Sequence, residues 1–100
     1  MRLMDLAKVV RSKNAGPLYL TFDVMFETED DYARGLAADG LKADAVAKRY
    51  NVSPNAITVI PYPPALAIKI TLPRHAPAGG PGDRDVYGAQ QHIGLLEVEV

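Results

Sequence analysis

The chain of 100 residues contains no cysteine, which excludes disulfide bonds, thiolate chemistry and every zinc site built on cysteine. Its two histidines, His75 and His92, are far apart in the sequence and form no pair with metal-ligand spacing, so we predict no metal site. We predict no cofactor either. A chain of this length has room for one hydrophobic core, which predicts a single domain over residues 1–100.

The chain also has little net charge and no long apolar run. Its formal charge is -1 and 48% of its residues are hydrophobic, which is typical of a folded protein rather than a disordered one. No apolar run has the length of a membrane-spanning helix, and the N-terminus has no signal-peptide h-region. No segment is basic enough to indicate a nucleic-acid partner. We therefore predict a cytoplasmic protein that binds neither membranes nor nucleic acids.

Alternation of apolar and polar residues predicts several strands. The clearest covers residues 17–27, where the even positions from Leu18 to Phe26 are apolar and Asp23 lies on the opposite side. Further strands are predicted over residues 56–62, 65–72 and 95–100, and a proline near the end of the first of these marks it as an edge or terminating strand. Residues 3–10 fit either a short helix or a strand.

Two helices are predicted between the first two strands. Thr28 is a suitable N-cap, and the acids over residues 29–31 stabilise the positive end of the helix dipole. Tyr32 and Leu36 belong to the apolar stripe of this helix, whereas Gly35 weakens it by about 1 kcal/mol relative to alanine. The second helix covers residues 42–50, with Val46 on its inner side.

This order of elements predicts an α+β fold. We expect a two-layer sandwich, ferredoxin-like in arrangement, with about four strands and helices on one face. The three prolines and three glycines of residues 73–84 predict a long loop, which extends to residue 92.

Residues 45–57 (AVAKRYNVSPNAI) have the pattern of a helix-turn-helix, in which a second, DNA-reading helix should follow the turn. The sequence continues as TVIPYPP, which is β-branched and interrupted by prolines, so that helix is not expected. We therefore predict no DNA binding.

The first candidate binding site is the polar run Arg11, Ser12, Lys13 and Asn14, interpreted here as a connection between two regular elements. An arginine fork fits a carboxylate or phosphate, and serine and asparagine can donate hydrogen bonds beside it. These residues could hold an acidic small molecule or a CoA phosphate. The alternative is a solvated turn in which Ser12 or Asn14 bonds to its own backbone.

The second candidate site follows the glycines of residues 79–82. Glycines allow the backbone to approach a ligand closely, and their exposed amides can bind an anion. His92 is a candidate general acid or base, with Asp85 or Asp83 to orient it. The alternative is a flexible arm whose polar residues are solvated or contact another subunit. Ligand- or partner-binding candidates in this part of the chain are Arg74, Asp83, Tyr87, Gln90 and Gln91.

Several stretches together resemble a small family of about this length that is described only as a domain of unknown function. They are Arg2-Leu3 through Arg11-Ser12, the acidic helix start, DAVAKRYNV, ALAIKITLPR, GGPGDRDVYGAQQH and LLEVEV, of which DVYGAQQH is the most specific. The layout is also similar to the C-terminal ferredoxin-like domain of acyclic terpene utilisation (AtuA-like) proteins. The opening of that domain, Asp-Leu-Ala followed by Arg-Ser, matches Asp5-Leu6-Ala7 and Arg11-Ser12, whereas its Gly-Asp-Lys-Gly continuation is replaced by Lys13-Asn14-Ala15-Gly16.

This resemblance implies a partner. Members of the small family typically accompany a large subunit related to the N-terminal part of AtuA-like proteins, in gene neighbourhoods for acyl-CoA or hydroxy-acid breakdown. We therefore expect an accessory small subunit of a catabolic enzyme complex, of lyase or hydratase type, acting on an acyl-CoA or a hydroxy acid. Two alternatives stay open. One is an independent enzyme that uses His92, Asp85 and Arg11 on an acidic metabolite, and the other is a homo-oligomeric binding module without catalytic activity.

Overall fold

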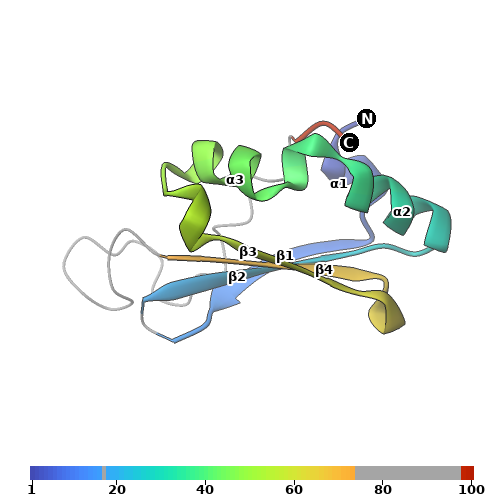
Figure 1. Cartoon of the computed structure of the whole chain (residues 1–100). Helices are drawn as coiled ribbons and strands as arrows, with labels where there is room; N and C mark the ends of the chain where they lie inside the picture. The colour runs from blue at the N-terminus through green and yellow to red at the C-terminus, as the bar shows by residue number, and fades with distance from the viewer. Residues whose placement is uncertain (17, 74–97) are drawn as a thin grey trace.

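The computed structural model describes residues 1–16, 18–73 and 98–100 (Figure 1). The strands are β1 (Val9–Asn14), β2 (Tyr19–Met25), β3 (Thr58–Tyr62) and β4 (Ala67–Pro73). The helices are α1 (Leu3–Leu6), α2 (Glu29–Ala37) and α3 (Ala43–Tyr50), joined by short 3-10 turns at Asp39–Leu41, Pro54–Ala56 and Pro63–Ala65.

The four strands form one open sheet in the order β1-β2-β4-β3, with every neighbouring pair antiparallel. β2 and β3 therefore run parallel to each other on either side of β4, and the chain passes between them through α2 and α3. This is a split β-α-β unit, the building block of ferredoxin-like arrangements. All three helices lie on the same face of the sheet (Figure 1), which confirms the α+β two-layer sandwich. β3 is an edge strand, as its proline predicts.

The fourth strand is not the one that the sequence predicted. The prediction placed it over residues 95–100, but the described end of that segment, Val98–Val100, forms a single bridge between Glu99 and Arg2. The strand beside β2 is β1 instead, and residues 3–10 contain both α1 and the start of β1. Ser12 occupies a core-side position of β1, so a polar residue interrupts the apolar alternation that would have revealed the strand. The Gly/Pro-rich loop lies outside the described residues, except for Pro73.

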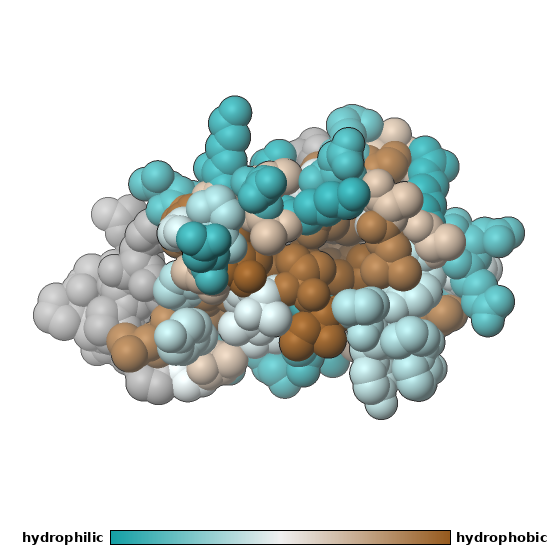
Figure 2. All heavy atoms as spheres, in the orientation of Figure 1, coloured by the Kyte–Doolittle hydropathy of each residue, from teal (hydrophilic) through white to brown (hydrophobic). Residues whose placement is uncertain are grey.

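The core lies between the sheet and the helices. The even positions of β2 and β4 are buried, and they pack against apolar residues of α1, α3 and the turn between the helices. Figure 2 shows hydrophobic side chains gathered between these two layers, with polar side chains above them. The largest fully buried side chains are Leu3, Phe22, Val24, Val46, Ile68, Ile70 and Leu72.

The start of α2 confirms the predicted cap. The Oγ1 atom of Thr28 accepts a hydrogen bond from the Asp31 backbone N–H at 3.1 Å. The predicted apolar stripe of this helix is wrong at one position, since Leu36 is 41% exposed while Gly35 is buried. A Cβ atom on Gly35 would overlap the ring of Phe26. The glycine therefore permits the helix to approach the end of β2 closely.

The segment after α3 confirms that no recognition helix follows. α3 ends at Tyr50, and its C-cap residue Asn51 adopts a left-handed conformation with φ 56°. The chain then turns through Pro54–Ala56 and enters β3 directly.

Gly35→Ala should lower the free energy of unfolding even though alanine favours helices. The added methyl group meets the ring of Phe26, and overpacking of this kind costs about 1–3 kcal/mol, which exceeds the gain of about 1 kcal/mol in helix propensity. Urea denaturation measures the difference. In a Phe26→Leu background the ring is gone, and the same substitution should raise stability; a loss of similar size in both backgrounds would contradict the contact.

Ionisation of the Tyr50 phenol should lower the stability of the fold at alkaline pH. Burial raises the pKa of Tyr50 from 10.0 to about 12, against the lowering effect of the neighbouring Arg49 charge. Its ring packs against Phe22, with 5.2 Å between centroids. Between pH 10 and 12 the unfolded chain ionises this phenol before the folded chain does, so stability should be intact below this range and decrease through it. Tyr50→Phe should flatten this part of the pH profile, and an unchanged slope would contradict the assignment.

Candidate functional site

The structure separates the four residues of the first candidate site. The prediction that Arg11–Asn14 connect two elements is wrong, because these residues are the last four of β1. Because side chains alternate between the faces of a strand, Arg11 and Lys13 are exposed on the face away from the helices, whereas Ser12 is buried on the helical side with Asn14. These four residues are adjacent in the sequence, but alternation along the strand places two of them on each face of the sheet.

The other predicted site residues lie outside the described part of the chain. They are Arg74, Asp83, Asp85, Tyr87, Gln90, Gln91 and His92.

The face of the sheet opposite the helices, named here the open face, brings Arg11 and Lys13 together with residues of β2 and β4. None of the described helices covers it (Figure 1). The register places Arg11 opposite Asp23 and Asp23 opposite Lys69, so that three charged residues form one row across the sheet. Lys13 lies in the adjacent row, opposite Thr21.

Among the described residues that line the open face, three are cations and one is a carboxylate. The Nε atom of Arg11 lies 3.5 Å from Oδ2 of Asp23, and only 11% of the Asp23 side chain is exposed. No described residue forms an ion pair with Lys13 or Lys69. Asp23 neutralises Arg11, and the two lysines give these four residues a net formal charge of +2.

Apolar residues form the other half of the open face. Tyr62 and Ile60 on β3 are 57% and 49% exposed. Tyr62 lies opposite Ala67, which in turn lies opposite Met25, and Ile60 lies opposite Lys69. Together with the charged row they line a hollow of about 470 Å³, named here the open-face hollow. Its lining residues are Arg11, Lys13, Asp23, Met25, Ile60, Tyr62, Ala65, Ala67 and Lys69.

The chemistry available in the open-face hollow is that of binding. Its cations can receive a carboxylate or another anion, and its aromatic and aliphatic side chains can cover an apolar group. Among residues 1–16, 18–73 and 98–100, no group of three or more His, Asp or Glu side chains is placed to hold a metal ion.

Sequence reasoning missed Asp23, Lys69 and Tyr62 as site residues. A signal was present, since Asp23 and Lys69 occupy the non-core positions of two alternating strands. The pairing of β2 with β4 joins these positions, and that pairing is not encoded in the local pattern of either strand.

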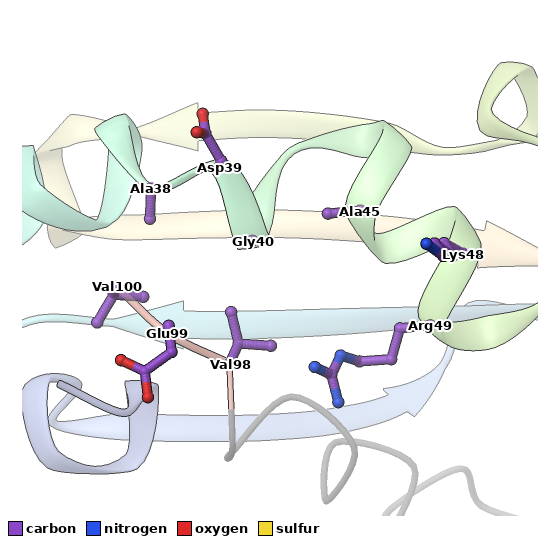
Figure 3. Close-up of a pocket in the computed structure, with 9 residues that line it drawn as sticks. All are labelled: Ala38, Asp39, Gly40, Ala45, Lys48, Arg49, Val98, Glu99 and Val100. Atoms are coloured by element: carbon purple, nitrogen blue, oxygen red, sulfur yellow. The ribbon is translucent and has the colours of Figure 1, made fainter.

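A second hollow, of about 880 Å³, lies between α3 and the C-terminal residues (Figure 3). Arg49 reaches from α3 toward Val98, and Gly40 lies so close that a Cβ atom there would overlap Val98. Two cations, Lys48 and Arg49, and two acids, Asp39 and Glu99, line this hollow without an excess of either charge.

The structure defines an α+β domain in which the helices cover one face of the sheet and no described helix covers the other. The chain belongs to the family described as Domain of unknown function (DUF4387), whose model matches residues 3–99. No curated protein and no solved structure shows a significant match to the chain. Within the described residues, no helix combines the length and apolar character needed to cross a bilayer.

Asp23→Asn should lower the free energy of unfolding by about 1 kcal/mol, the upper range for a partly exposed ion pair. The substitution removes the Arg11 pair and leaves the cations of the open face without their carboxylate. Lys13→Gln is the matched control, because it removes a charge from the same face without breaking an ion pair between described residues. It should change stability by no more than about 0.5 kcal/mol. Equal losses in the two variants, measured by urea denaturation, would contradict this assignment.

Proposed function

We propose that the chain is an accessory small subunit of a catabolic enzyme complex and that its open face docks onto an AtuA-like large subunit. The complex would act on an acyl-CoA or a hydroxy acid, as a lyase or hydratase. In this role the small subunit completes or covers an active site held mostly by the large subunit. The similarity of the N-terminal motif to the AtuA-like C-terminal domain supports the choice of partner, and the open face supports docking as the role.

The composition of the open face is the observation that carries the proposal. Ile60 and Tyr62, which line the open-face hollow, are about half exposed, at 49% and 57%. Contiguous apolar groups rimmed by polar residues are typical of protein-protein contact surfaces, in which tyrosine, methionine and arginine are enriched. These side chains are exposed to water in the isolated chain, so their burial by a partner would contribute favourably to binding.

The position of Arg11 favours an accessory role over an independent enzyme. The independent-enzyme alternative uses Arg11 with His92 and Asp85 to bind an acidic metabolite. In the structure Arg11 lies on the edge strand β1, and its guanidinium is paired with Asp23 of β2 on the open face. Because Asp23 already pairs with the Arg11 guanidinium, we interpret Arg11 as a residue that orients a partner protein on the open face.

Co-expression with the AtuA-like large subunit tests the proposal. We expect the two chains to elute as one complex in size-exclusion chromatography, and we expect turnover of an acyl-CoA or hydroxy acid by the complex but not by the small subunit alone. Separate elution of the two folded chains would contradict the proposal.

The open face can be tested with one substitution in that complex. Ile60→Asp places a charge in the apolar half of the face and should weaken the complex at least tenfold, a loss of about 1.4 kcal/mol. Leu36→Asp is the matched control, because Leu36 is 41% exposed on the helical layer. Its complex should form with wild-type affinity. Equal weakening by both variants would mean that the partner does not dock on the open face.

A further inference from the structure

The two lysines without ion-pair partners specify what can cover the open face. Lys13 and Lys69 extend from β1 and β4 on either side of β2, and no described residue neutralises them. Burying an ammonium group without an opposite charge costs several kcal/mol. A partner surface that covers the apolar half therefore has to bring carboxylates to these two positions, or it loses the energy gained from apolar contact.

The carboxylate already on the open face does not meet this requirement. Asp23 lies in the same row as Arg11 and Lys69, with its Oδ2 atom 3.5 Å from the Arg11 Nε atom. With Arg11, Lys13 and Lys69 as cations and Asp23 as the one acid, the described lining of the open-face hollow has a formal charge of +2. The compensating negative charge has to come from outside the described residues.

A second copy of this chain is a poor occupant for the same reason. In a symmetric dimer the same patch of each copy faces the other, so the cations of one open face would meet those of the partner copy. None of the exposed acids among the described residues belongs to a strand of the sheet; they are Asp5, Glu27, Glu29, Asp30, Asp39, Asp44 and Glu99. Contact between these acids and the open face of another copy would be head-to-tail, which gives growing chains of subunits rather than a closed dimer.

We infer that the open face recognises a different protein through an apolar surface that carries two acidic side chains, one for Lys13 and one for Lys69. This inference rests on the proposed docking role and adds the chemistry of the partner to it. The apolar half of the partner surface packs over Ile60 and Tyr62, and its carboxylates pair with the two ammonium groups. The charges guide the encounter and exclude like-charged surfaces, including a second copy of this face.

The first experiment measures affinity for the AtuA-like large subunit as a function of salt. Lys69→Glu should weaken the complex at least tenfold and reduce its dependence on ionic strength, because a charge that pairs with an acid becomes repulsive. Lys48→Glu is the matched control: it makes the same charge change at an exposed lysine of α3, also without an ion pair among the described residues. Its affinity should stay within about twofold of wild type. Wild-type affinity of the Lys69→Glu complex would overturn the inference.

The second experiment uses the isolated chain, so its result does not depend on the large subunit. By analytical ultracentrifugation at low ionic strength, the wild-type chain should be monomeric. The double variant Lys13→Met, Lys69→Met should associate reversibly, because its open face keeps the Arg11–Asp23 pair and gains apolar area. A wild-type dimer formed through this face, or a double variant that stays monomeric, would overturn the inference. Failure of the large subunit to bind would instead contradict the docking proposal.

Discussion

The antiparallel pairing of β2 with β4 is the contact on which the rest of the structure depends. These two strands are the centre of the sheet, and their register places Phe22 beside Ile70 on the helical side. The same register places Asp23 beside Lys69 on the open face. A slip by one residue would move the charges into the core and the core residues to the surface. The core and the candidate site are therefore fixed by one register.

Much of the fold could be predicted because the hydrophobic pattern is strong where the chain is buried on one side. The alternation of residues 17–27, the Thr28 cap and the proline-interrupted strand before Pro63 all correspond to elements of the structure. β1 was missed because its core-side positions include Ser12 and Asn14, which do not stand out as apolar. The role of Gly35 was misjudged because helix propensity is a local property, whereas its contact with Phe26 is a tertiary one.

The candidate site was predictable only in part, for a related reason. Arg11 and Lys13 stood out as adjacent cations, but their neighbours Asp23 and Lys69 come from strands that are distant in the sequence. Strand pairing creates the open face, and a run of residues cannot show it. The exposed side chains of the open face contribute little to the stability of the fold. Two lysines without ion-pair partners among the described residues add little to folding, and exposed tyrosine and isoleucine leave apolar area unburied. These features are consistent with a surface that is completed by binding.

Docking through the open face is tested most directly by hydroxyl-radical footprinting of the chain, free and bound to the large subunit proposed as its partner. Met25 and Tyr62 report on the open face, whereas Met4, which is 44% exposed, and Leu36 lie on the helical side of the sheet. The account predicts that binding protects Met25 and Tyr62 from oxidation and leaves Met4 and Leu36 as reactive as before. Protection of Met4 and Leu36, with Tyr62 still reactive in the complex, would contradict it.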